Sequence, residues 1–148
     1  MASLHPPVKS AGDVGNRLRS LIDRPAYHQS LKGDRSTPAS HLGQVLEQQQ
    51  AIDGWSVAVD ADDDGDDELL AALWAIGAAN RGYGALLCGC FSPAPVLSEL
   101  VALDAAALAR RLASLSPLPV VNDALEDACA LSRQTLEHLV DEALAAAH

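Results

Sequence analysis

The chain has little lysine, few aromatic residues and no long apolar run, and each shortage argues against a class of function. Both lysines, Lys9 and Lys32, lie near the N-terminus, so the rest of the chain offers none for a Schiff base or a phosphate-binding loop. The strongest apolar stretch, residues 69–79, is too short to span a bilayer. The chain has one Phe and two Trp, with abundant alanine and leucine. This composition is typical of closely packed helices that cover a small sheet.

Basic residues are also scarce beside acidic ones, and the net charge is −10. Residues 1–50 carry six Lys/Arg against four Asp/Glu, whereas residues 51–148 carry four Arg against sixteen acids. Because binding to a phosphate backbone needs a basic footprint, the acidic body argues against nucleic acid and against membrane surfaces as partners. The basic N-terminal stretch is suited to contacting something acidic, including the protein's own body.

Neither histidine nor serine is placed for ordinary acid–base or nucleophilic catalysis. None of the five histidines follows a predicted strand, where the catalytic groups of α/β folds gather; they are His5, His28, His41, His138 and His148. Ser92 lacks the glycine-flanked turn of hydrolases. The sequence therefore favours a protein that is not an enzyme.

The three cysteines, Cys88, Cys90 and Cys129, do not complete a zinc site, because a fourth ligand and a second paired motif are missing. Packing in the core as small apolar side chains is the preferred interpretation, and redox or metal sensing is the alternative. The first residues lack the charged start and apolar core of a secretory signal. We therefore expect a cytoplasmic location, where cysteines stay reduced.

Three segments are strand candidates, namely residues 55–60, 83–91 and 118–121. The second is apolar without alternation, as in a central strand that is covered on both faces. Apolar spacing predicts helices over residues 68–80, from residue 96 to about 115, and from residue 123 onward. Asp104 is placed to restart the second of these helices, and Asn122 or Asp123 to cap the third.

This alternation predicts an α/β fold, with a small three-stranded parallel sheet and flanking helices. The alternative is an all-helical bundle in which residues 83–91 form a buried connection. Proline and glycine punctuate residues 1–37, which we expect to form a flexible N-terminal arm with one short helix over residues 14–22. Residues 38–148 then form a single α/β domain. It opens with a polar helix over residues 40–50, and Asp53-Gly54 signals a turn after it.

Residues 60–68 hold seven acids in nine positions. Asp60, Asp62 and Asp64 alternate before a glycine, as in the first half of a calcium-binding loop, but the twelfth position holds alanine where such a loop has a bidentate glutamate. The preferred interpretation is a solvated turn whose last acids complement the start of the next helix. The alternative is a calcium or magnesium site formed by Asp60, Asp62, Asp64 and Glu68.

A parallel sheet would also bring together, at one edge, the polar residues that follow its three strands. Ligands bind at that edge in open α/β sheets. Ser92, Asn122 and Asp123 would then lie near Asp60 and Asp62 and surround a magnesium ion or a small polar molecule. This arrangement is the basis for a magnesium-dependent, phosphoryl-handling enzyme as one alternative function.

The preferred function is that of a small cytoplasmic interaction or regulatory protein without catalytic activity. The predicted helices carry more apolar surface than a three-stranded sheet can cover, so we expect a homodimer, another homo-oligomer or a complex with a protein partner. The uneven charge suits salt-sensitive contacts. The two alternatives are the cation-binding module at residues 60–68 and the enzyme at the sheet edge. No cofactor besides calcium or magnesium is expected.

Overall fold

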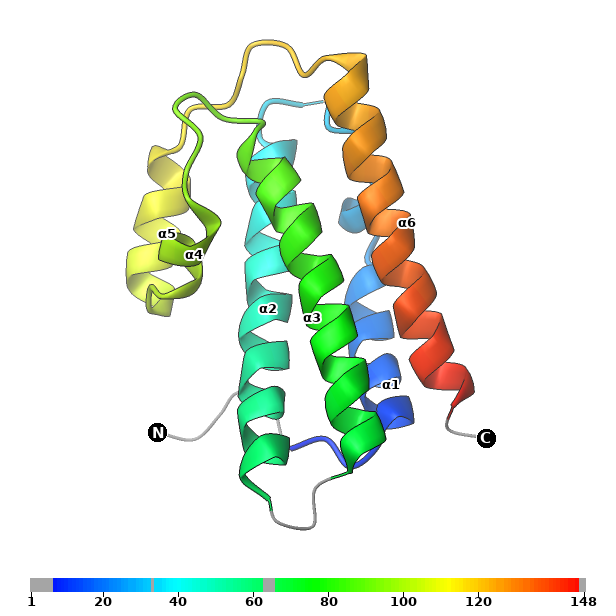
Figure 1. The fold of residues 1–148 in the computed structure, drawn as a ribbon. Helices are drawn as coiled ribbons and strands as arrows, with labels where there is room; N and C mark the ends of the chain where they lie inside the picture. The colour runs from blue at the N-terminus through cyan, green and yellow to red at the C-terminus, as the bar shows by residue number, and fades with distance from the viewer. Residues whose placement is uncertain (1–6, 33, 63–65, 147–148) are drawn as a thin grey trace.

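Four helices lie side by side and form the body of the protein in a computed structural model, which describes residues 7–32, 34–62 and 66–146 (Figure 1). They are α1 (Ala11–Ile22), α2 (Thr37–Ala61), α3 (Asp67–Cys88) and α6 (Asp123–Ala145). α3 packs between α2 and α6, and α1 packs mainly against α6. α2 and α3 run in opposite directions and form an antiparallel hairpin.

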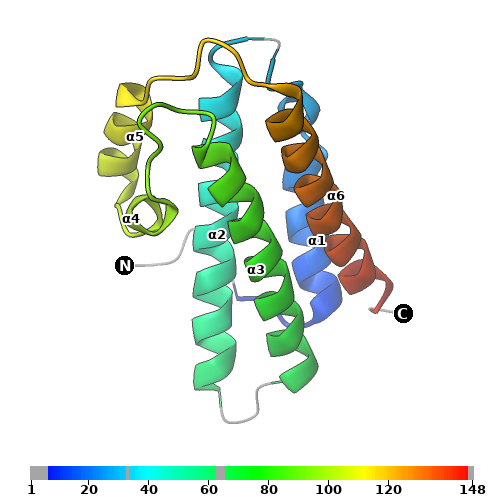
Figure 2. The same cartoon turned by 45° about the horizontal axis from the view of Figure 1, so that its top comes forward.

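Two short helices, α4 (Leu97–Val101) and α5 (Ala105–Ser114), pack beside α2 near one end of the bundle (Figure 2). From α5, residues 115–122 cross that end of the bundle to reach α6. A single 3-10 turn, η1 (Pro25–His28), follows α1 and contacts α2.

Polar side chains begin several helices at the positions that the sequence predicts. The Asp104 carboxylate accepts a hydrogen bond from the Ala107 backbone N–H at 2.7 Å, and Asn122 Oδ1 accepts one from the Leu125 N–H at 2.8 Å. Each side chain thereby satisfies a donor that the first turn of a helix leaves unpaired. The predicted starts of α5 and α6 are confirmed.

The α/β prediction, by contrast, is wrong, because the described residues form helices and contain no strand. The β-type pairing among them is one isolated bridge between Phe91 and Pro117. Residues 118–121, predicted as a strand, belong to the extended connection before α6, where the Leu118 N–H donates to the Cys90 carbonyl at 2.8 Å. The protein has the alternative, all-helical architecture.

The segments predicted as a helix (68–80) and a strand (83–91) are largely one helix, α3. Asn80-Arg81-Gly82 resembles a helix stop, but the Asn80 side chain bonds to α2 and leaves the helix uninterrupted. Gly84 permits close packing instead of a turn, since a Cβ there would lie 3.1 Å from methyl carbons of Val45 and Leu97. An apolar run of this length fits a strand or a buried helix equally well.

The strand predicted over residues 55–60 is the last part of α2. The helix continues through Asp53-Gly54, because Gly54 lies exposed on its solvent side and Asp53 accepts hydrogen bonds from Gln49 and Arg81. Ile52 and Trp55 are buried three residues apart, which is helical spacing.

Residues from the predicted N-terminal arm contribute to the core. Val14, Leu18 and Ile22 of α1 are at most 1% exposed, and Tyr27 of η1 is fully buried. They join apolar residues of α2, α3 and α6 in one cluster. α1 is therefore part of the bundle.

Candidate functional site

The acidic segment forms the connection between α2 and α3 at one end of the bundle (Figure 1). Asp60 lies in the last turn of α2, and Asp62 is the C-cap residue that follows the helix. Asp66 caps α3 and accepts hydrogen bonds from the backbone N–H groups of Glu68, at 2.9 Å, and of Leu69. Asp64 lies outside the described residues. Among those that are described, no three His, Cys, Asp or Glu side chains gather in a way that would hold a metal ion. Cation binding by this segment stays a prediction from the sequence.

The residues predicted for the sheet edge lie at the opposite end of the bundle from Asp60 and Asp62. α3 has 22 residues and separates the two sets by roughly 33 Å, so no single ion can be bound by both. Ser92 donates its backbone N–H to Ser116, Asn122 caps α6, and Asp123 forms an ion pair with Lys32. The predicted edge required a sheet, and the described residues form none.

A hollow of about 430 Å³ does lie near Asn122 and Asp123, between the loop that precedes α2 and the connection that precedes α6. Its walls are mostly apolar residues of both segments, including Leu31, Leu118 and Val120. The Lys32–Asp123 pair neutralises two of its charges. The described residues that line this hollow include no histidine, cysteine or serine.

The cysteines are buried free thiols near the same end. Cys88 ends α3, Cys90 follows it, and Cys129 lies in α6. The Cys129 thiol donates a hydrogen bond to Cys90, which lowers the pKa of Cys90 and raises that of Cys129; burial raises the pKa of Cys88. Their burial agrees with a packing role, and a redox role stays a prediction.

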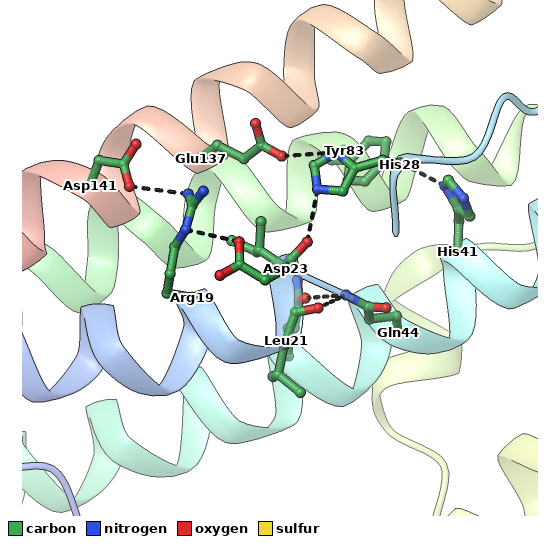
Figure 3. Close-up of polar contacts among 11 residues, drawn as sticks. Arg19, Leu21, Asp23, His28, His41, Gln44, Tyr83, Glu137 and Asp141 are labelled. Carbon is green, nitrogen blue, oxygen red and sulfur yellow. Dashed lines mark hydrogen bonds and ion pairs between the residues drawn. The ribbon is translucent and has the colours of Figure 1, made fainter. Parts of the chain in front are cut away.

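Polar side chains inside the bundle join α2 to α3. Asn80 accepts a hydrogen bond from Gln48 Nε2 at 2.9 Å and donates to Gln49 Oε1 at 2.9 Å and to the Val45 carbonyl at 3.0 Å. Gln44 extends this network to the Leu21 carbonyl at the end of α1 (Figure 3). Gln48, Gln49 and Asn80 are at most 1% exposed. A network of this kind fixes the register of two helices and has no access to a substrate.

An aromatic group lies beside this network, at the level of η1. His41 Nδ1 and the Tyr83 hydroxyl are 3.0 Å apart, and Tyr27 stacks on His41 and meets Tyr83 edge to face (Figure 3 shows the His41–Tyr83 contact). Burial raises the pKa of Tyr83 to about 12 and raises that of Tyr27 further. Both phenols are therefore neutral and inward-facing, and they serve packing.

Sequence reasoning missed these buried polar residues because it treated residues 40–50 as a polar helix whose last residues, 47–50, are solvated. The available signal was their spacing. Gln48 falls on the same helical stripe as Val45 and Ile52, which are buried.

The basic N-terminal segment contacts the protein's own acidic body along α6. Arg19 pairs with Asp141 at 3.1 Å, His28 lies 3.7 Å from Glu137, and Lys32 pairs with Asp123 (Figure 3 shows the first two contacts). Ser30 also donates a hydrogen bond to Glu126. These contacts engage four acids of α6, Asp123, Glu126, Glu137 and Asp141, with the N-terminal segment of the same chain.

One side of α3 is left uncovered by the other described helices. Its exposed positions between residues 70 and 88 recur at helical spacing, and we call this set the outer α3 face: Ala71, Trp74, Ala75, Ala78, Arg81, Gly82 and Ala85. Trp74 is 60% exposed. Residues 69–88 contain no acid, although the chain carries twenty. The one charge, on Arg81, is paired with Asp53 at 2.9 Å.

Two hollows flank Arg81 on this face. One, of about 310 Å³, lies between α2 and α3 and is lined by Val57 and Trp74 among others. The other, of about 580 Å³, lies between α3 and α4. It is lined by Arg81, Gly82, Ala85, Val96, Leu97, Ser98 and Val101. The outer α3 face is thus an apolar surface with a protruding indole and a groove.

Although α3 is apolar nearly all round, the described part of the chain contains no helix with both the length and the hydropathy needed to cross a bilayer. Comparison of the chain with protein-family models, with curated proteins and with solved structures finds no match.

Proposed function

We propose that the protein acts by binding another protein chain through the outer α3 face, without catalysis of its own. The observation that carries this proposal is a tryptophan 60% exposed on a helix side free of acids, in a chain of net charge −10. Single exposed apolar residues are ordinary in folded proteins. A whole helix side that is apolar, however, is typical of the core of a protein interface.

The neighbouring elements extend this surface. Val57 of α2 is 70% exposed and Val96, just before α4, is 54% exposed, and they lie in the linings of the two hollows. Tryptophan is enriched among the residues that dominate binding energy, where it fills an apolar pocket on the partner. Trp74 is therefore the residue on which we expect affinity to depend most.

The charge distribution supports the same surface. Acids at the α2–α3 connection and on α6 give the molecule a repulsive negative field, whereas the Arg81–Asp53 pair leaves the outer α3 face close to neutral. A partner can approach that face without the desolvation of unpaired charges, which is costly at an interface centre.

The proposal is tested with a photoreactive amino acid placed at Ala78, the centre of the outer α3 face, in cells that naturally make the protein. We expect irradiation to give cross-linked species of discrete mass, and we expect Trp74→Ala to remove them. The matched control carries the same amino acid at Asn16, an exposed position of α1. Equal cross-linking from both positions, or none from position 78, would contradict the proposal.

A further inference from the structure

We infer that the chain bound at the outer α3 face is a second copy of the protein, related by a two-fold axis through Ala78. This inference rests on the proposed function and specifies its partner. In this arrangement the two α3 helices are antiparallel, and Trp74 of each copy enters the groove beside Gly82 of the other.

The spacing of residues along α3 makes the face self-complementary. Trp74 and Gly82 lie equally far on either side of Ala78, and so do Ala71 and Ala85. A two-fold axis through Ala78 therefore sets the protruding indole of one copy at the level of Gly82 in the other, on the side of the helix that carries Arg81 and the groove. Ala71 then meets Ala85 and Ala78 meets its own copy, which lets the two helices approach closely, and Ala75 lies at the level of Arg81.

The space above Gly82 suits an incoming side chain. A Cβ built on Gly82 would have the Ser132 hydroxyl, at 3.9 Å, as its nearest neighbour, so the surface there is open. The adjacent groove of about 580 Å³ is mostly apolar and has Arg81 in its wall. An indole in this groove can bury its apolar ring and meet the Arg81 guanidinium in a cation–π contact.

Charge selects the antiparallel orientation. The seven acids of residues 60–68 immediately precede and begin α3. A parallel pair would bring two such segments together at one end, where like charges repel. The antiparallel pair places them at opposite ends, roughly the 33 Å length of a 22-residue helix apart.

The decisive test introduces single cysteines on the outer α3 face and oxidises the purified protein with oxidised glutathione. Ala78→Cys places two thiols at the axis, so we expect a disulfide-linked dimer. Ala71→Cys alone should give none, because antiparallel pairing sets residue 71 against residue 85, about 21 Å along the helix from its own copy. The double variant Ala71→Cys/Ala85→Cys should again cross-link, and the parent chain with its buried cysteines is the background control.

Sedimentation equilibrium measures the association without any cross-link. We expect a monomer–dimer equilibrium that Ala78→Glu weakens by about tenfold or more, because it places two carboxylates at the axis. Trp74→Ala should weaken it as well, and Asn16→Ala should not. Circular dichroism checks that each variant remains helical.

The outcomes separate this inference from the proposed function. A parent chain that stays monomeric at every concentration, yet cross-links from position 78 to a different protein in cells, overturns the second copy and retains the binding face. A dimer that cross-links through Ala71→Cys but not through Ala78→Cys overturns the antiparallel register. Loss of both the dimer and the cellular cross-links contradicts both proposals.

Discussion

The inner and outer sides of α3 are both largely apolar, yet they face opposite surroundings. On the inner side, Leu73, Ile76 and Leu87 are at most 1% exposed, and Asn80 is held by hydrogen bonds to α2. On the outer side, Trp74 and Ala78 face solvent in the single chain. Burial in the bundle accounts for the inner residues. It does not account for an outer side without acids in so acidic a chain.

This difference shows that the monomer can be fully folded while part of its apolar surface stays uncovered. The four-helix core is closed by α1 and α6 without help from the outer α3 face, so substitutions there should leave the monomer intact. Substitutions on the inner side should unfold it. The two sides can therefore be tested by neighbouring residues of one helix.

The largest expected contrast is between Leu73→Ala and Trp74→Ala. Leu73 is fully buried, so its truncation should lower the free energy of unfolding by about 3 to 4 kcal/mol, through lost burial and the cavity left behind. Trp74→Ala should change it by less than about 0.5 kcal/mol in dilute, monomeric protein, because its side chain is mostly in water.

Urea unfolding followed by circular dichroism at low protein concentration measures both variants. Similar losses for the two would mean that Trp74 packs within its own chain. A loss for Trp74→Ala that grows with protein concentration would instead report the removal of a contact between chains.

Sequence patterns located the helix starts better than the helix extents. Asp104, and Asn122 or Asp123, could be proposed as caps because capping is local and is decided within three residues; the structure shows that Asn122 is the cap of α6. The continuity of α2 through Gly54 and of α3 through Gly82 depends on packing and hydrogen bonds from residues far along the chain. Local signals alone favoured turns and strands there.

The candidate site could be predicted only in part for the same reason, because its position depends on packing between distant residues. The sequence indicated excess apolar helix surface, and hence a homo-oligomer or a complex with a protein partner. It assigned no residue to the contact, because Trp74 was one of several apolar residues on the predicted helix over residues 68–80. Which side of α3 stays open depends on where α6 and α4 pack. The predicted ligand edge with Ser92 and Asp123 depended on a sheet, which the described residues do not form.

The next largest effect concerns the polar part of the inner side. Asn80→Ala should lower the free energy of unfolding by about 2 to 3 kcal/mol, because it leaves Gln48, Gln49 and the Val45 carbonyl without their buried partner. The control is Asn16→Ala on exposed α1, for which we expect a change below about 0.5 kcal/mol. Both variants are measured by thermal and by urea unfolding. If Asn80→Ala and Asn16→Ala changed the free energy of unfolding equally, the network would contribute no more than an ordinary surface asparagine.

A pH dependence follows from the two tyrosines, both of which are buried and are the only tyrosines of the chain. Burial raises the pKa of Tyr83 to about 12, whereas an unfolded chain loses phenolic protons near pH ~10. Between these values the unfolded state binds fewer protons than the folded state, so the free energy of unfolding falls as pH rises. Stabilisation by the neutral phenols is fully present below pH ~10.

Tyrosinate absorbance and helical circular dichroism, recorded along one alkaline titration, check this dependence. We expect the phenols to ionise only as the helices unfold. Tyr83→Phe should remove about half of the absorbance change, since one phenol of two remains. Full ionisation near pH ~10 with the helices intact would show that the inner side of α3 is open to water.

The smallest effects come from glycines, which extend the comparison between packed and open helix sides. A Cβ on Gly15 would lie 2.8 Å from Leu144 Cγ and 2.9 Å from the Leu144 backbone nitrogen, so Gly15→Ala must push α1 away from α6 and should cost about 1 to 2 kcal/mol of stability. At Gly54 a Cβ meets nothing within 4 Å, and Gly54→Ala should raise the free energy of unfolding by about 0.5 to 1 kcal/mol through helix propensity. Urea unfolding of both variants gives the two signs. If Gly54→Ala destabilised the monomer, the solvent side of α2 would be covered by something within the chain, and the distinction between packed and open sides would fail there.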